Sequence, residues 1–179
     1  MFQIYKTRVD IREGAPLQAE AQGLVVAAND HLWMGGGAAL AVKQAGGEGI
    51  EIEAVRQGPV ALGTAVSTGA GSLGFRRIYH AVVMGQDLKV RHDQIPGALN
   101  AALGLAAREN VESLVVTPLE SDELIGPFHE AAGLVVSTLF DALTGKTTVR
   151  ELVLSVGRAE ARDAYRAAFH QVLGSGGHK

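Results

Sequence analysis

Short runs of apolar residues recur along the chain and alternate with stretches in which apolar residues return every three or four positions. The short runs are rich in Val, Ile and Leu without regular polar alternation, which is the pattern of strands covered on both faces. We predict four such buried strands, at Leu24–Ala28, Ile78–Val83, Leu114–Val116 and Leu152–Val156. The first residues, FQIYKTRV at positions 2–9, alternate better between apolar and polar and predict an edge strand.

The stretches between these runs have the spacing of amphipathic helices. Their apolar residues follow the i, i+3, i+4 rule and therefore share one face. We predict three long helices, at Pro96–Arg108, Glu130–Leu143 and Ala161–Leu173, and two shorter ones at Gly37–Ala45 and Glu48–Gln57.

One further strand, Thr64–Thr68, precedes the glycine-rich segment GAGSLGF. This segment spells G-x-G-x-x-G at positions 69–74, but it separates two strands and opens no helix, so it predicts a turn and not a dinucleotide site. The alternation of strands and helices predicts one α/β domain over residues 1–173, with a mixed, mostly parallel sheet between helical layers. The last segment, GSGGHK at 174–179, has the composition of a disordered tail.

Composition narrows the classes of function. The chain has 179 residues, 47% of them hydrophobic, and this suits one buried core. No apolar stretch reaches the length of about 18 residues that suggests a membrane span. The absence of cysteine excludes disulfides and thiolate chemistry, and a first segment unlike a secretory signal favours the cytoplasm. A formal net charge of −3, with basic residues scattered among acids, disfavours nucleic-acid binding and suits a small nucleotide better.

The most informative segment is the loop from Asn29 to Gly37, which follows a buried strand and opens a helix. Ligands of open α/β sheets bind beyond the carboxyl ends of the strands. Consecutive glycines let the backbone approach a diphosphate, and the first turn of the next helix offers unpaired N–H donors. The amide of Asn29 donates and accepts hydrogen bonds, which suits a ribose hydroxyl. We interpret the loop as a nucleotide-diphosphate site; an ordinary strand–loop–helix connection is the alternative.

The segment VVAANDHLWMGGGAALAVKQAGG, residues 25–47, resembles the signature of the macro domain family, in which NAAN precedes a glycine run and a helix. The resemblance continues through AVRQGPVALGTAVSTGAGSLGFRRIYHAVVMG and PGALNAALGLAARENVESLVVTPL, and it spans roughly residues 9–173. It implies a three-layer α/β/α fold that binds ADP-ribose. Because some macro domains hydrolyse ADP-ribosyl linkages, it also implies an ADP-ribosylated protein as a partner.

Carried over position by position, the resemblance places a ribose and a diphosphate along this loop. Asn29, preceded by Ala28, matches the Asn near the distal ribose that carries catalysis in hydrolytic members, while the first Asn of NAAN is Val26 in this chain. An Asp that some hydrolases have after the glycine run falls near Ala39, where there is no acid. The residues that match the diphosphate-binding run and the helix start are Gly35, Gly36, Gly37 and Ala38.

The same resemblance gives Asp10 a role at the adenine. Asp10, in the segment VDI with Ile11, matches the Asp that accepts a hydrogen bond from the adenine amino group. The glycine that precedes this Asp in the family is Val9, and about five extra residues separate Asp10 from the segment AAN. A surface Asp at the end of a strand is the alternative.

The loop after the strand at Leu114–Val116 departs most from the family. Macro domains have a small Ser/Gly-Thr-Gly stretch at this point, whereas this chain has PLESDELIGPF at 118–128. A carboxylate about 4 Å from a phosphate costs about 4 kcal/mol at an effective dielectric of about 20, and a helix N-terminus returns only about 0.3–1 kcal/mol. The acids Glu120, Asp122 and Glu123 must therefore point to solvent, or the ligand is not ordinary ADP-ribose. The ligand contacts that we predict in this loop are Ser121, Leu124, Ile125 and Gly126.

Two hypotheses for function follow. The first is a macro domain that binds ADP-ribose or a related nucleotide diphosphate, with hydrolysis through Asn29 left open. The second is a non-catalytic relative whose ligand has changed or been lost, in which the acids of 120–123 bind a cation or face solvent. We predict no cofactor and no metal site, because cysteine is absent and the six histidines lack paired ligand spacing. His80, inside IYHAVV, is expected to be a hydrogen-bonded core residue.

Overall fold

The strands of the structure, a computed structural model that describes residues 1–119 and 128–175, form one seven-stranded sheet. In chain order the strands are β1 (Phe2–Ile4), β2 (Thr7–Glu13), β3 (Gly23–Asn29), β4 (Ala65–Thr68), β5 (Arg77–Met84), β6 (Ser113–Val116) and β7 (Glu151–Val156). The helices are α1 (Gly37–Gly46), α2 (Gly49–Val55), α3 (Ile95–Arg108), α4 (Phe128–Thr144) and α5 (Ala159–Ser175). Two short 3-10 helices, η1 (Pro16–Gln18) and η2 (His92–Gln94), lie in the connections.

The inner strands of the sheet run parallel, and the two edge strands run antiparallel. The order is β1-β2-β7-β6-β3-β5-β4, in which β1 is antiparallel to β2 and β4 is antiparallel to β5. All the pairs between β2 and β5 in this order are parallel. This confirms the predicted mixed, mostly parallel sheet. The carboxyl ends of β3, β5 and β6 consequently meet at one edge, where ligands of open α/β sheets bind.

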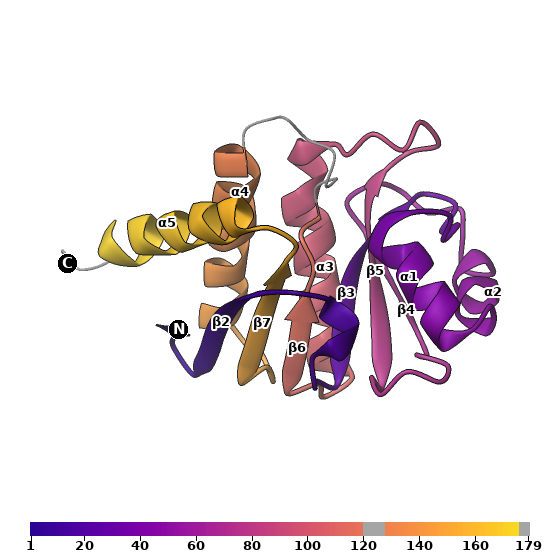
Figure 1. Cartoon of the computed structure of the whole chain (residues 1–179), viewed down its shortest axis with the longest axis horizontal. Helices are drawn as coiled ribbons and strands as arrows, with labels where there is room; N and C mark the ends of the chain where they lie inside the picture. Colours follow the sequence, from indigo (N-terminus) through magenta and orange to yellow (C-terminus); the bar gives the residue numbers. More distant parts are fainter. Residues whose placement is uncertain (120–127, 176–179) are drawn as a thin grey trace.

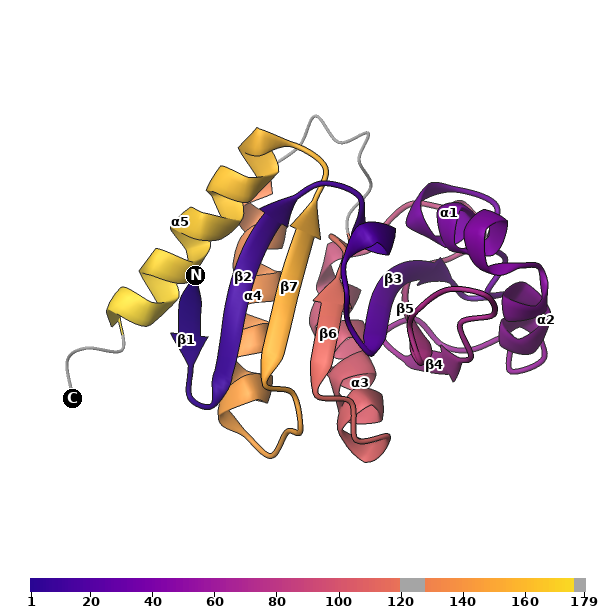
Figure 2. The same ribbon diagram turned by 60° about the horizontal axis from the view of Figure 1, so that its bottom comes forward.

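Helices cover the sheet on both faces, which confirms the three-layer α/β/α architecture (Figures 1 and 2). On one face α3, α4 and α5 contribute side chains such as Leu99 and Phe169 to the buried cluster that also contains Val25 of β3. On the other face α1 and α2 lie over the half of the sheet formed by β3, β5 and β4, and Val42 of α1 packs with Leu24. Because the neighbours Leu24 and Val25 point to opposite faces and are both fully buried, β3 has an unbroken apolar run.

The predicted strands and helices from Leu24 onward all occur, with ends that differ by a few residues at most. The segment 69–74 is confirmed as a turn, since it joins the antiparallel strands β4 and β5. The largest differences lie at helix ends, where α4 and α5 begin two residues earlier than predicted. α5 also ends at Ser175, so Gly174 and Ser175 belong to this helix and not to the predicted tail.

The N-terminal run is the one element that the prediction described wrongly, because it forms two strands and not one. The chain reverses at Tyr5 and Lys6, and Ile4 pairs with Thr7 across this turn. Tyr5 has a φ of 49°, in the left-handed region. β2 then lies inside the sheet between β1 and β7, so β1 alone is the edge strand. The reversal escapes a sequence pattern because Tyr-Lys contains none of the Gly, Asn or Asp residues typical of a two-residue turn.

Candidate functional site

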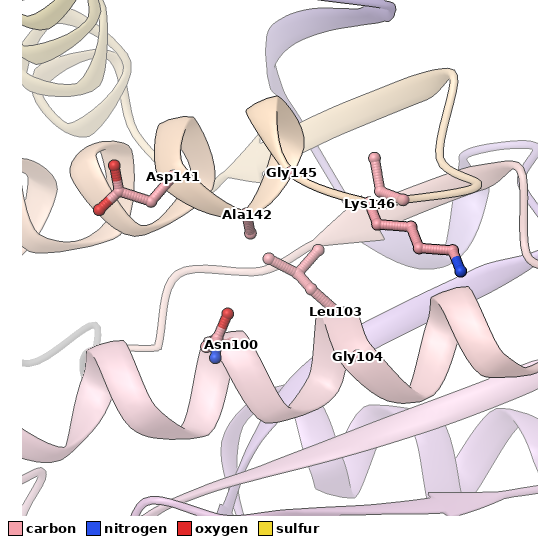
Figure 3. Close-up of a pocket in the computed structure, with 8 residues that line it drawn as sticks. Asn100, Leu103, Gly104, Asp141, Ala142, Gly145 and Lys146 are labelled. Atoms are coloured by element: carbon pink, nitrogen blue, oxygen red, sulfur yellow. The ribbon is translucent and has the colours of Figure 1, made fainter.

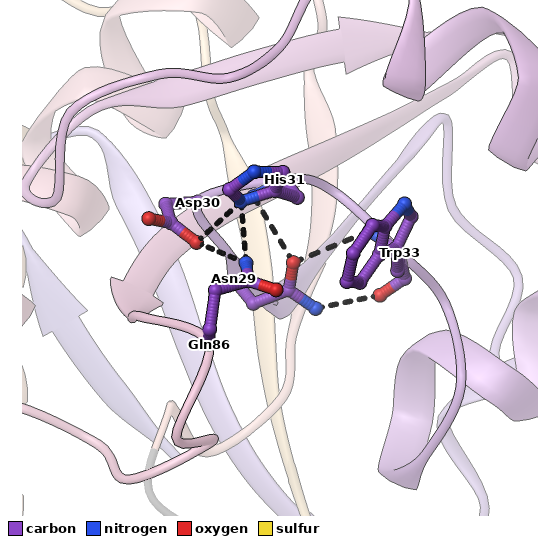
Figure 4. A network of polar contacts seen from close by, with 5 residues as sticks. All are labelled: Asn29, Asp30, His31, Trp33 and Gln86. Atoms are coloured by element: carbon purple, nitrogen blue, oxygen red, sulfur yellow. Dashed lines mark hydrogen bonds and ion pairs between the residues drawn. The ribbon is translucent and has the colours of Figure 1, made fainter.

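Asn29 ends β3 at the carboxyl edge of the sheet and holds the loop that follows (Figure 4). The residue is buried, with 6% of its surface exposed. Its Oδ1 accepts hydrogen bonds from the backbone N–H groups of His31 (3.1 Å) and Trp33 (3.3 Å). Its Nδ2 donates to the carbonyl oxygen of Trp33 at 2.8 Å. The side-chain amide therefore closes its own loop, and one N–H of Nδ2 has no partner among the residues that the structure describes.

A second group of polar contacts holds the outer side of the same loop. His31 Nδ1 lies 3.0 Å from Asp30 Oδ1, and Gln86 Nε2 donates to that oxygen at 2.6 Å and also contacts His31 Nδ1. The contact with His31, and after it the one with Gln86, lowers the pKa of Asp30. Gln86 comes just after β5, so the rule that functional residues follow parallel strands could have pointed to it.

The glycine run that follows exposes its backbone. A Cβ atom at Gly35, Gly36 or Gly37 would meet no heavy atom within 4 Å. α1 begins at Gly37 with no side-chain cap and no acidic residue in its first turn. Among the described residues, none accepts a hydrogen bond from the N–H groups of residues 35–38. Helix N-termini carry a partial positive charge of about half a unit, so these amides form a site where an anion can bind.

Glu51 of α2 binds the backbone just before the glycine run. Its Oε2 accepts a hydrogen bond of 2.6 Å from the N–H of Met34 and lies 3.2 Å from Nζ of Lys43 in α1. The Met34 side chain is itself buried. One carboxylate thus joins the loop, α1 and α2. Sequence reasoning missed this residue, because no motif marks a contact across 17 residues.

A model of the Macro domain family matches residues 25–135 of the chain. The match begins within β3, includes the loop held by Asn29 and the glycine run, and ends within α4. The chain belongs to the macro domain family. The resemblance seen in the segment from Val25 to Gly47 is thereby confirmed.

Relatives and solved structures agree with this assignment. An uncharacterized protein of Aquifex aeolicus is 37% identical over 102 residues, which make up 56% of this macro domain and 62% of that protein. A macrodomain of Oceanobacillus iheyensis, solved as a mutant with ADPR, has a TM-score of 0.84 at 19% identity and covers 97% of both chains. A Trypanosoma brucei macrodomain in complex with ADP-ribose has a TM-score of 0.78 at 18% identity, covering 89% of this chain and 68% of that one. At these identities the two structures show the shared fold.

Asp10 does not lie at the carboxyl edge of this macro domain. Asp10 pairs with Val153 of β7, Val153 pairs with Val115 of β6, and Val115 pairs with Leu24 of β3. Asp10 therefore lies at the same height in the sheet as Leu24. Leu24 precedes Asn29 by five residues, or about 16 Å at about 3.3 Å per residue. The carboxylate of Asp10 is also occupied, since it lies 2.8 Å from Nε of Arg12 and accepts a hydrogen bond from the next backbone N–H. The adenine role of Asp10 stays a prediction that the geometry does not favour.

About five more residues than in the family separate Asp10 from the segment AAN. The structure explains this difference, because β2 continues past Asp10 to Glu13. The edge of the sheet is reached at Gly14, with φ of 141°, and at Ala15, just before η1. A shift of five residues from Asp10 reaches Ala15, which has no carboxylate. Ile11, the predicted neighbour of Asp10 in the site, is buried in the core under α3, α4 and α5.

The remaining predicted contacts fall into two groups. Ala28 is buried next to Asn29, and Ala38 is the second residue of α1 beside the glycines, so the structure brings these two together with the loop. The ligand contacts predicted after β6 lie outside the described residues, and so do the acids of 120–123. These predicted contacts are Ser121, Leu124, Ile125 and Gly126. The described chain before them ends beside β3, where Thr117 donates from its hydroxyl to the carbonyl oxygen of Val25 at 2.8 Å.

The hollow drawn in Figure 3 has none of the glycine-run residues 35–37 in its lining. It is a space of about 270 Å³ between α3 and the end of α4, lined by residues such as Asn100, Leu103, Asp141 and Lys146. In the described part of the chain, no group of three or more His, Cys, Asp or Glu is placed to hold a metal ion. Nor is any helix of the described residues both long and apolar enough to cross a membrane.

His80 is confirmed as a hydrogen-bonded core residue. It is fully buried in β5, and its Nε2 lies 2.9 Å from Oγ1 of Thr68. Because the Thr68 hydroxyl donates to the carbonyl oxygen of Gly69, Nε2 must carry the proton and Nδ1 must be bare. Nδ1 is buried without a partner among the described residues. Burial lowers the pKa of His80 to about 4, so the ring is neutral near pH 7.

Proposed function

We propose that this macro domain binds ADP-ribose or a related nucleotide diphosphate at the carboxyl edge of β3. The diphosphate lies on the backbone amides of Gly35, Gly36, Gly37 and Ala38, and the distal ribose lies beside Asn29. The observation that carries the proposal is the start of α1, which has no side-chain cap, no acid in its first turn and, within residues 1–119 and 128–175, no acceptor for these amides. The macrodomains of Oceanobacillus iheyensis with ADPR and of Trypanosoma brucei with ADP-ribose support this choice of ligand.

Hydrolysis of an ADP-ribosyl linkage is a further part of the proposal. One N–H of Asn29 is without a partner in the described part of the chain, and this donor can hold the oxygen of a water molecule beside the ribose. The substrate is then an ADP-ribosylated protein. We also propose that this macro domain is located in the cytoplasm. Incubation with such a protein tests the step: release of ADP-ribose by the wild type supports hydrolysis, and no release leaves a protein that only binds.

Three sequence features favour the alternative of a relative with a changed ligand: the acidic segment 120–123, and two features within the described residues. Val26 replaces an Asn of the family and is fully buried, and Ala39 stands where some hydrolases have an acid. Thermal-shift screening with nucleotides, with and without divalent cations, separates the hypotheses. Stabilisation by ADP-ribose alone supports the proposal, whereas stabilisation that requires a cation supports the alternative.

Isothermal titration calorimetry with ADP-ribose tests the proposed site when the wild type is compared with Gly36→Val. Gly36 has extended backbone (φ −162°) and open space around it, so valine fits the free protein but occupies the space of the ligand. We expect saturable binding by the wild type and at least about tenfold weaker binding by Gly36→Val, equivalent to about 1.4 kcal/mol.

The matched control is Gly74→Val, in the turn before β5, where a Cβ atom also meets nothing within 4 Å. This variant is expected to bind as the wild type does. No heat from the wild type at high micromolar protein would exclude ADP-ribose as the ligand. Equal affinities of the wild type and Gly36→Val would exclude the glycine run as the site.

A further inference from the structure

Trp33 is the single tryptophan of the chain, and 53% of its surface is exposed. Its neighbours Leu32 and Met34 are each only 1% exposed. The chain therefore anchors both sides of Trp33 in the core and turns the indole outward. Leaving so large an apolar group in water forgoes the stabilisation that its burial would provide.

The outward position of Trp33 is held by polar contacts. Both its backbone N–H and its carbonyl are bonded to the Asn29 side chain. The ring of His31 lies 5.0 Å from the indole at an angle of 39°, and Asp30 and Gln86 fix the His31 ring in turn (Figure 4). Another exposed aromatic residue, Tyr5, has no ring beside it in the described part of the chain and lies at the β1–β2 turn, at the other edge of the sheet.

Single exposed apolar residues are common and need no function. Trp33 differs because its backbone is bonded to Asn29 and its ring contacts that of His31, and because it lies between the proposed ribose site at Asn29 and the glycine run. Rigid aromatic side chains are typical of binding sites, since they offer a large flat surface and lose little conformational entropy on binding. A ring of the ligand can stack on the face of the indole that His31 leaves free.

We propose that Trp33 stacks on a flat ring attached to the distal ribose, so that the preferred ligands are ADP-ribose compounds that carry a flat heterocycle on that ribose. This inference rests on the proposed function, because Asn29 must lie beside the distal ribose. A heterocycle joined to this sugar is within reach of the residue whose backbone Asn29 binds. Linkages of ADP-ribose to aliphatic side chains offer no ring to stack.

The probes are ADP-ribose and nicotinamide adenine dinucleotide, which is ADP-ribose with a pyridine ring on the distal ribose. Calorimetry gives the affinities for both compounds. The reduced form of the dinucleotide is a third probe: its ring is uncharged, so it shows whether attraction between the positively charged oxidised ring and Asp30 contributes to the affinity. We expect both dinucleotides to bind about five- to tenfold more tightly than ADP-ribose. Emission on tryptophan excitation reports Trp33 alone, and we expect the oxidised dinucleotide to quench it more than ADP-ribose does.

Trp33→Leu is expected to lower the affinity for both dinucleotides until it equals that for ADP-ribose, while Trp33→Phe keeps part of the preference. Tyr5→Leu, with a comparably exposed aromatic residue, is the control and is expected to change neither affinity. Equal wild-type affinities, or a preference that survives in Trp33→Leu, would overturn the stacking role and leave ADP-ribose binding intact. Failure of the wild type to bind any of the three compounds would overturn the proposed function, and the stacking role with it.

Discussion

Replacement of Asn29 by alanine removes three hydrogen bonds at once from the loop that displays Trp33. Each such bond contributes about 0.5–1.5 kcal/mol net, and the residue is nearly buried. Because the longest of the three, at 3.3 Å, is weak, we expect Asn29→Ala to lower the free energy of unfolding by about 2–3 kcal/mol. For a protein of this size that is a fall in Tm of roughly 4–12 °C.

Thermal unfolding of the free protein measures this effect without any ligand. Asn100→Ala is the matched control, since Asn100 is exposed on α3 and alanine favours the helix, so its Tm should stay the same or rise slightly. A fall of less than about 1 °C in Asn29→Ala would refute the structural role of the amide. If the fall occurs, reduced activity of Asn29→Ala reports a displaced loop as well as a lost ligand contact.

Three further changes test other parts of the structure. Gly37 has φ of 58°, so Gly37→Ala should cost about 1–2 kcal/mol in urea unfolding, whereas Gly36→Ala should cost less than half as much. His80 has a pKa of about 4 when folded and 6.5 when unfolded, so its stabilising contribution is complete above about pH 6.5 and lost as the pH falls to 4. The wild type should thus lose about 3 kcal/mol more than His80→Gln between pH 7.5 and 4, and parallel pH profiles would contradict this. Glu51→Ala leaves Met34 N–H and Lys43 without their partner and should lower stability by about 1–2 kcal/mol, whereas Glu20→Ala, at an exposed residue, should not.

The arrangement of the fold could be predicted because its strongest signals are local. The apolar run of β3 is buried on both faces, and the regular spacing in α3 and α5 reflects a single buried side of each helix. The hairpin at Tyr5 could not be predicted, because its positive φ is imposed by the pairing of β1 with β2 and not by a turn-forming residue.

The candidate site could be predicted in part. The position of the glycine run follows from the order of strand, loop and helix. The contacts that shape it do not, because Glu51 reaches Met34 from another helix and Asn29 uses its amide on its own loop. The sequence around Asp10 points to the site, and only the register shows that β2 continues beyond this residue.

The most direct test of ligand binding at the glycine run is a titration of the isotope-labelled protein with ADP-ribose, followed through its backbone amide resonances. We expect saturable shifts of the amides of Gly35, Gly36, Gly37 and Ala38. We expect no shift at Gly104 or Gly145, which line the hollow between α3 and α4. Shifts confined to that hollow, with the glycine run unchanged, would contradict binding at the glycine run.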